Sequence, residues 1–299
     1  MFIKVPNQNL NFLVIVILYN REIDESETIN SLIRCKNVFH EKDYIVVWDN
    51  SPNAQDSFKL NRIKELFKNF HYKHSGINQP LPVVYNSIIH SFDKDVDYVN
   101  IWDQDSTFSI DYYESFLNSF KNLDEIQIFV PKVFNGKTLE SPGFFFHFKG
   151  KKISKGKCFG IQSIKNKVAI MSGIIISYDM FFSVEFDERL RLYGVDTKFF
   201  KDAGRLVDKF FVMDYSLNHD LSIYDTNENV KKKIYRFKDF CYSTLVICSK
   251  NLNLFILFGF VFLLYKSVQN IFRFKDFRFF YSFIEGVVDW YKISYQRKA

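Results

Sequence analysis

The chain is poor in the residues that build disulfide-rich, zinc-binding or repetitive proteins. Only four of its 299 residues are cysteine, with no Cys-x-x-Cys pair and no histidine nearby at metal-ligand spacing. A disulfide framework or a structural zinc site is therefore not expected. There is no internal repeat, Gly/Ser linker or low-complexity stretch. The polar start, followed by an apolar run of only Phe12 to Leu18, does not resemble a signal sequence, so we expect the protein to stay in the cytoplasm.

Composition and charge narrow the class further. With 47% hydrophobic and 25% charged residues the chain is neither disordered nor collagen-like, and its 36 phenylalanines must bury much ring surface. The net charge of +6 is uneven, because the part from Lys231 onward holds 13 basic and 4 acidic residues. An acidic body with a basic, aromatic tail is not typical of nucleic-acid binding. It indicates a domain whose end seeks an anionic surface, most simply a membrane.

The first hundred residues alternate between predicted strands and helices. Three apolar runs, 12–18, 44–48 and 98–102, are typical of strands buried on both faces of a sheet. Helices are expected over 60–70 and 86–92. This alternation predicts an open α/β sheet with mixed or parallel strands flanked by helices.

Polar residues follow each of these strands. Tyr19, Asp49 and the pair Asp103 and Asp105 stand where the strands end, and ligands of such sheets bind beyond the carboxyl ends of the strands. Two carboxylates at this spacing can hold Mn²⁺ or Mg²⁺, which would neutralise a nucleoside diphosphate. The same spacing at 93–95 precedes its strand and is not favoured. A solvated turn is the alternative for Asp103 and Asp105.

Two further residues could carry chemistry. Asp196 begins a predicted helix that Gly204 ends, and an ionised carboxylate there could take a proton from a hydroxyl nucleophile. A helix cap is the alternative for it. His219 could complete an oxygen-rich metal site or touch phosphate, although most isolated histidines do neither. Asp187 and Glu188 are interpreted as structural.

The basic segment 231–233 with Tyr235 and Arg236 could pair with phosphates or form a solvated basic face. Beyond it, the apolar run 252–265 has 14 residues, short of the roughly 20 that cross a bilayer. We expect it to lie on a membrane or to pack against the body. Basic and aromatic residues alternate around it, which suits an interfacial helix on anionic lipid. Packing of these aromatics on a second subunit, as a homodimer, is the alternative.

In their order, these motifs resemble the family 2 glycosyltransferases, especially the bacterial rhamnosyltransferase-like branch. The likeness covers nearly the whole chain. It is carried by the segments Ile17-Leu18-Tyr19-Asn20, Val47-Trp48-Asp49-Asn50-Ser51, Asn78 to Asn86, Trp102-Asp103-Gln104-Asp105-Ser106, Ser172-Gly173, Tyr193-Gly194-Val195-Asp196-Thr197, His219, Tyr235-Arg236 and Phe283-Ile284-Glu285-Gly286-Val287-Val288-Asp289.

The resemblance implies a GT-A fold and a role for each matched residue. Tyr19 and Asp49 would line the nucleobase pocket. Asp103 would hold the ribose and metal side of the donor, while Asp105 would bind Mn²⁺ or Mg²⁺ with His219 as a further metal or diphosphate ligand. Asp196 would deprotonate the acceptor hydroxyl. Ser172 and Gly173 would border the acceptor.

The implied activity is an inverting, metal-dependent transfer of a sugar to a growing cell-surface polysaccharide such as O-antigen or capsule. The donor would be dTDP-rhamnose or a UDP-hexose, and the acceptor an oligosaccharide or polyprenyl-linked glycan. The enzyme would sit peripherally at the inner face of the cytoplasmic membrane. A catalytic domain is expected over 1–230, with a nucleotide-sugar half to about 110 and an acceptor half from 111, followed by a helical segment over 231–299.

The sequence departs from the family pattern in three places. Trp48 replaces a smaller aliphatic residue, Pro80 and Pro82 stand where Gly and Ala are frequent, and Lys198 to Lys201 replaces an acidic, Arg-containing turn. Two other functions stay open. A nucleotidyltransferase could use a similar crevice, although no Gly-rich phosphate loop follows the first strand. A non-catalytic carbohydrate-binding or scaffold protein would use the carboxylates only as caps and turns.

Overall fold

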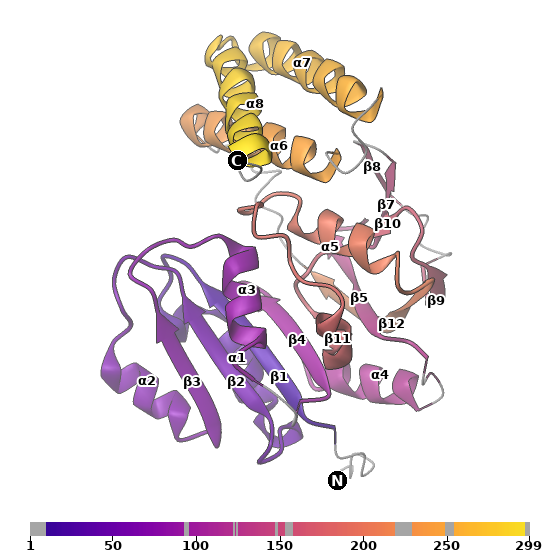
Figure 1. Cartoon of the computed structure of the whole chain (residues 1–299). Coiled ribbons are helices and arrows are strands. Elements are labelled where there is room, and N and C mark those ends of the chain that lie inside the picture. The colour runs from indigo at the N-terminus through magenta and orange to yellow at the C-terminus, as the bar shows by residue number, and fades with distance from the viewer. Residues whose placement is uncertain are drawn as a thin grey trace.

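The protein folds as a mixed α/β sheet flanked by helices, with three further helices at its C-terminal end (Figure 1). The structure is a computed structural model and describes residues 10–92, 96–121, 123, 125–146, 149–152, 158–218, 229–248 and 254–296. The main sheet has the strand order β3-β2-β1-β4-β11-β5-β12-β9, with β6 paired to β5, and a small sheet has the order β10-β7-β8.

The strands and helices have the following bounds. The strands are β1 Phe12–Leu18, β2 Tyr44–Asp49, β3 Asn69–His74, β4 Tyr98–Asp103, β5 Ile128–Asn135, β6 Thr138–Ser141, β7 Gly143–Phe146, β8 Lys149–Lys152, β9 Gly160–Ser163, β10 Lys167–Val168, β11 Ile174–Ser177 and β12 Lys209–Asn218. The helices are α1 Glu27–Arg34, α2 Ser57–Lys64, α3 Leu81–Ile89, α4 Asp111–Phe120, α5 Val195–Ala203, α6 Val230–Cys248, α7 Leu254–Phe274 and α8 Arg278–Gln296.

Strand β1 explains why the sheet is covered on both faces. All seven of its residues are buried, and alternate side chains enter two different apolar clusters. Leu13, Ile15 and Ile17 face the cluster that contains α3, α5 and α6, whereas Phe12 and Val14 belong to the cluster of α1, α2 and α4. A continuous apolar strand is what this two-sided burial requires.

The parallel and antiparallel parts of the sheet meet at β11. Strands β3, β2, β1 and β4 run parallel. Strand β11 pairs antiparallel with β4 on one side and with β5 on the other, and β12 is again parallel to β5. The expected mixed α/β sheet is thus confirmed.

Two predicted helices differ from the structure. The helix expected over 60–70 begins at Ser57 and ends at Lys64, and Asn69 to His74 form the edge strand β3. Edge strands are exposed on one side and carry polar residues, so this one lacks the apolar run that marks the central strands. Helix α3 begins at Leu81, earlier than expected, because a proline in the first turn loses no hydrogen bond there.

Helices α6, α7 and α8 form a group beside the sheet (Figure 1). Helix α8 lies close to α6 at Gly286, where a Cβ atom would stand 2.8 Å from the Lys238 carbonyl oxygen. Helix α7 continues well past the 14-residue apolar run, and over Ile256–Phe274 it is long and apolar enough to cross a membrane by length and composition. The sequence predicts an apolar segment too short to cross a bilayer, and this prediction is wrong about the length of the segment.

Candidate functional site

The register of three parallel strands brings two predicted site residues to one edge of the sheet. Strand β1 lies between β2 and β4, with Leu18 opposite Asp49 and Ile17 opposite Asp103. Both carboxylates therefore stand at the carboxyl end of β1, one on each side of it. This is the edge at which ligands of open α/β sheets bind.

Asp49 is fully buried and held by three donors. Its Oδ1 accepts the Ser51 backbone N–H at 2.9 Å, and its Oδ2 accepts the Gln55 amide at 2.9 Å and the Tyr72 hydroxyl at 2.8 Å. Burial raises the pKa of Asp49, but these hydrogen bonds outweigh it and hold the pKa below its usual value. These three donors hold Asp49 as an ionised carboxylate at the end of β2, and its side chain is closed to solvent.

The loop after β4 is tied to two neighbouring elements. The Gln104 side chain accepts the Tyr19 backbone N–H at 2.8 Å and donates to the Tyr19 carbonyl at 3.3 Å. From the start of α1, the Thr28 hydroxyl donates to the Asp103 carbonyl and accepts the Ser106 N–H at 3.0 Å. The Tyr19 ring itself is 44% exposed and free to meet a ligand. The backbone of the proposed donor site is thus fixed before a ligand arrives.

The two candidate metal ligands differ in exposure. Asp103 is half-buried and Asp105 is exposed. Among the described residues no group of three or more His, Cys, Asp or Glu side chains gathers to hold a metal ion, and His219 lies outside them. Two carboxylates still fit Mn²⁺ or Mg²⁺, because such ions commonly take one or two protein carboxylates and complete their shell with substrate phosphates and water.

Ser172 and Gly173 connect this edge to the second half of the sheet. The Ser172 hydroxyl accepts the Asp103 backbone N–H at 3.1 Å and bonds to the Ser106 hydroxyl at 2.8 Å. Gly173 has φ +77°, and a Cβ there would lie 2.9 Å from Leu217 Cδ1 and 3.2 Å from the Trp102 ring. Both residues therefore shape the backbone around Asp103, in addition to any contact with an acceptor.

Asp196 lies in the first turn of α5, close enough to Asp103 for the two charges to interact. Burial raises the pKa of Asp196 to about 7, and the negative charge of Asp103 acts in the same direction. The backbone N–H groups of Asp196 and Met171 oppose this shift. A carboxylate with a pKa near neutrality can both accept and hold a proton, which is the property of a general base.

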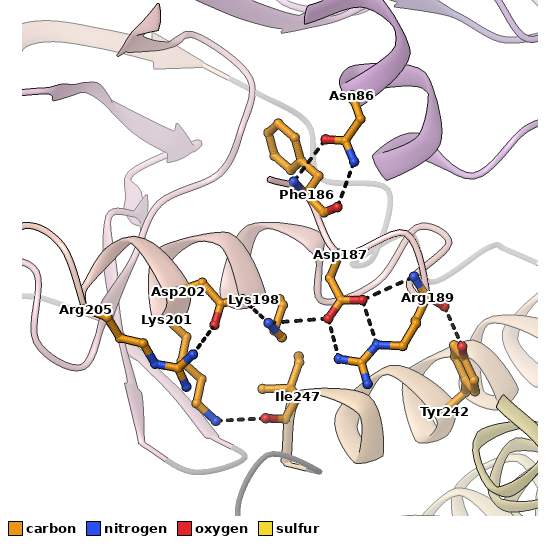
Figure 2. A network of polar contacts seen from close by, with 10 residues as sticks. All are labelled: Asn86, Phe186, Asp187, Arg189, Lys198, Lys201, Asp202, Arg205, Tyr242 and Ile247. Carbon is orange, nitrogen blue, oxygen red and sulfur yellow. Dashed lines mark hydrogen bonds and ion pairs between the residues drawn. The ribbon is translucent and has the colours of Figure 1, made fainter. Parts of the chain in front are cut away.

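A network of buried charges underlies α5 (Figure 2). The Lys198 side chain, which is 3% exposed, pairs with Asp202 and lies 3.3 Å from Asp187. Burial raises the pKa of Asp187, but hydrogen bonds and charge from Arg189, with the charge of Lys198, bring it to about 2. The adjoining Phe186 backbone is held by Asn86 of α3, at 2.9 and 3.0 Å. These contacts agree with the structural interpretation of Asp187.

The remaining predicted residues lie away from the strand ends. Tyr235 and Arg236 are on α6, where Tyr235 is 68% exposed. The sequence interpretation missed the partners of Asp49, which are Gln55 and Tyr72, and a buried carboxylate on α6, Asp239. No local motif marks them. The one available signal is a charged pair, Lys238 and Asp239, between the aromatic residues Phe237 and Phe240.

Comparison with known proteins identifies the fold and the family. The chain aligns with GalNAc-T7, crystallised with UDP, GalNAc and Mn²⁺, at a TM-score of 0.56 and 14% identity over 79% of this chain and 48% of that one. It aligns with S. aureus TarS at a TM-score of 0.53 and 15% identity, over 88% of this chain and 44% of that one. It aligns with TarS 1-349 at a TM-score of 0.51 and 13% identity, over 89% of this chain and 92% of that one. It thus spans about half the length of GalNAc-T7 and of the longer TarS chain.

These neighbours share the GT-A fold with this chain. No curated protein sequence matches it significantly. The family model described as glycosyl transferase family 2 matches residues 13–178. Since this match covers more than half of the chain and includes the strands that carry Asp49 and Asp103, the chain belongs to glycosyl transferase family 2.

Proposed function

We propose that the protein is an inverting glycosyltransferase that moves a hexose from a nucleoside diphosphate to a hydroxyl group of a cell-surface glycan. The observation that carries this proposal is that Asp196, a half-buried carboxylate at the start of α5, lies near enough to Asp103 for their charges to interact, while Asp103 and Asp49 flank the carboxyl end of β1. The candidate base on α5 and the donor-side carboxylate at the end of β4 then lie close together.

In the proposed reaction the site residues act as follows. Asp49 and Tyr19 line the nucleobase pocket, and Asp103 holds the ribose side of the donor. Asp105, with Asp103 and His219, would hold a divalent cation, which would neutralise the charge of the diphosphate. Asp196 takes the proton from the acceptor hydroxyl as its oxygen bonds to the anomeric carbon. The bond from that carbon to the phosphate oxygen breaks, and the nucleoside diphosphate leaves.

The two halves of the catalytic domain would bind different substrates. We propose a catalytic domain over residues 1–230, in which the part to about 110 binds the donor and the part from 111 binds the acceptor next to Ser172 and Gly173. The likeness to the rhamnosyltransferase branch favours dTDP-rhamnose, and UDP-hexoses are the next candidates. GalNAc-T7 was crystallised with UDP and Mn²⁺, which supports testing UDP and manganese here.

We also propose that α7 and α8 bind the inner face of the cytoplasmic membrane, where a polyprenyl-linked acceptor would be presented. Both helices expose apolar side chains at helical spacing: Leu257, Phe258, Val261, Leu264, Tyr265, Val268 and Phe272 on α7, and Tyr281, Ile284, Val288 and Tyr291 on α8. Exposed basic residues lie near these stripes, namely Arg273, Lys275 and Arg278. This combination favours an anionic lipid surface.

The donor site is tested by thermal unfolding of the full chain with UDP, dTDP or GDP, each with and without Mn²⁺. A ligand at 100 times its Kd stabilises by about 2.7 kcal/mol. We expect one nucleotide to raise the Tm only with Mn²⁺, and Asp105→Asn to lose this shift. If no nucleotide stabilises the folded protein, a scaffold or carbohydrate-binding role replaces the enzyme. Pyrophosphate release from a nucleoside triphosphate and a sugar phosphate would instead identify a nucleotidyltransferase.

The membrane proposal is tested by flotation with liposomes that contain anionic lipid. The full-length protein should float at low salt and remain at the bottom with neutral liposomes. Failure to float with anionic liposomes, together with a dimer in sedimentation, would assign the stripes to a second copy of the chain.

A further inference from the structure

Helix α6 contacts the segment that carries the candidate base. The Tyr242 hydroxyl donates to the Arg189 carbonyl, and the Lys201 ammonium donates to the Ile247 carbonyl at 2.8 Å (Figure 2). These two bonds join α6 to the loop before α5 and to the second half of α5. The base-bearing helix is therefore tied to the C-terminal helices on both sides of Asp196.

The turn that begins α5 fits closely against α6. Gly194 has φ +77°, which L side chains rarely adopt, and a Cβ there would stand 2.7 Å from Ile247 Cδ1 and 3.3 Å from Ser243 Cβ. Glycine is needed for the backbone conformation and for the close approach. The turn has little room to shift while α6 stays in place.

A buried carboxylate of α6 holds the residue before this glycine. Asp239 is 7% exposed, and its Oδ2 accepts the Tyr193 backbone N–H at 3.1 Å, whereas its Oδ1 has no hydrogen-bond partner among the described residues. Burial raises the pKa of Asp239, and the Tyr193 N–H, the charge of Arg191 and the Leu192 backbone oppose that rise. Burying a carboxylate is costly unless it is hydrogen-bonded, so Asp239 depends on the backbone of this turn for its burial.

We propose that Asp239 is a positioning residue: from α6 it holds the turn at Tyr193 and Gly194 and thereby fixes the start of α5 and the direction of the Asp196 carboxylate. This inference rests on the proposed role of Asp196 as the base. It makes α6 part of the catalytic unit, although α6 belongs by sequence to the basic tail. Misplacement of a catalytic group by about 1 Å can cost on the order of 100-fold in rate.

The test compares three variants of the full-length protein. Asp239→Ala removes the acceptor, and Asp239→Asn keeps an acceptor oxygen of the same reach. Ser267→Ala is the matched control, because it removes a buried hydroxyl of α7 that has no hydrogen-bond partner in the part of the chain that the structure describes. Hydrogen exchange is followed by mass spectrometry in peptides that cover 189–197. Asp239→Ala should lose protection there and retain it in β1 and β4, while Asp239→Asn and Ser267→Ala should resemble the wild type.

Turnover supplies the second measurement. The substrate is the nucleotide sugar, from a panel of UDP-hexoses, dTDP-rhamnose and GDP-mannose, whose diphosphate raises the Tm. We expect Asp239→Ala to lower kcat about 10- to 100-fold with the donor KM changed less than about 2-fold. Asp239→Asn should keep kcat within about 3-fold. A structural role alone would lower the amount of folded protein and leave kcat per folded molecule unchanged.

The outcomes separate this inference from the proposed function. Unchanged exchange over 189–197 in Asp239→Ala, or an unchanged kcat, overturns the positioning role even if Asp196→Asn is inactive. Full activity of Asp196→Asn overturns the base assignment instead. Absence of any Mn²⁺-dependent nucleotide shift overturns the donor site, and the exchange measurement still decides whether Asp239 holds the turn.

Discussion

The side chains of the sheet and those of the C-terminal helices are buried to different extents. In β1 every residue is buried between two helical layers, and the polar groups that follow β1, β2 and β4 are bonded to one another. In α7 and α8 one apolar side is buried and another is exposed. Side chains of α6 and α8 contribute to the apolar cluster that covers one face of the sheet, whereas the outer sides of α7 and α8 present a surface that a lipid bilayer or another chain would cover. Four variants, one of them a double variant, test that difference.

The largest effect is expected at Asp196. Asp196→Asn should lower turnover by about 100- to 10,000-fold, the usual contribution of a general base. The Mn²⁺-dependent Tm shift with nucleotide should persist, because the amide keeps the donor side of the site intact. Loss of that shift together with activity would contradict a role limited to the acceptor proton.

The same variant should be more stable than the wild type at high pH. The folded pKa of Asp196 is about 7, above the unfolded value of about 3.9, so the folded state binds the proton more tightly. Stability of the wild type then falls as the pH rises from about 4 to 7. The Tm advantage of Asp196→Asn, measured without metal, should be larger at pH 8 than at pH 5. An equal advantage at both values would contradict the raised pKa.

The next largest effect is expected inside the sheet. Gly173→Ala combines a positive φ with contacts of 2.9 to 3.2 Å to Leu217, Pro131 and Trp102, and it should cost about 2–4 kcal/mol in the free energy of unfolding. Gly136→Ala is the control, since its φ is +57° and its Cβ would meet nothing within 4 Å. Urea unfolding should place Gly136→Ala well above Gly173→Ala in stability. Equal losses in the free energy of unfolding would mean that the cost comes from the positive φ alone and not from the contacts of the added Cβ.

A smaller effect is expected between the helices. Gly286→Ala would place a Cβ 2.8 Å from the Lys238 carbonyl oxygen and 2.9 Å from Cys241 Cβ. Alanine favours helix by about 1 kcal/mol, which offsets part of an overpacking cost of about 1–3 kcal/mol. We expect a net loss of about 1 kcal/mol in thermal unfolding, with faster hydrogen exchange confined to α6 and α8. A gain in stability would show that α8 can move away from α6 without a loss of packing energy.

The smallest effect on stability is expected on the exposed face of α7. Val261→Ser and Leu257→Ser, at residues 59% exposed, should change the Tm by less than about 1 °C, because surface substitutions usually stay within 0.5 kcal/mol. The double variant should nevertheless bind anionic vesicles several-fold more weakly. Val16→Ser, in the buried strand β1, is the contrasting control and should unfold the protein. Unchanged vesicle binding would remove these residues from the proposed membrane surface.

Much of the donor side could be predicted from sequence because its signals are local. Long apolar runs mark strands buried on both faces, and the residue after each run falls at one edge of a parallel sheet. The sequence predicts Tyr19, Asp49 and Asp103 in this way, and the strand register places Asp49 and Asp103 at one edge, with Tyr19 directly after β1. Their roles in binding stay predictions.

Other elements gave weaker signals for a physical reason. Edge strand β3 is largely polar and lacks the apolar run of a central strand, and helices α7 and α8 are apolar on more than one side, so the pattern does not show which side is buried. The contacts of Asp239 with Tyr193 and of Asn86 with Phe186 join residues 46 and 100 positions apart. No spacing rule within the sequence indicates such pairs. The ion pair of Lys198 with Asp187 likewise depends on the loop before α5, whereas its pair with Asp202 has the i,i+4 spacing of a helix.

The place of β11 between β4 and β5 has a consequence for how the protein folds. The parallel strands before it can form from neighbouring βαβ units, whereas the bond from the Asp103 N–H to the Ser172 hydroxyl joins residues 69 positions apart. Contacts that close long loops form late and slowly. The donor edge can therefore take shape early, and the site as a whole becomes competent only when β11 closes the loop between the two halves.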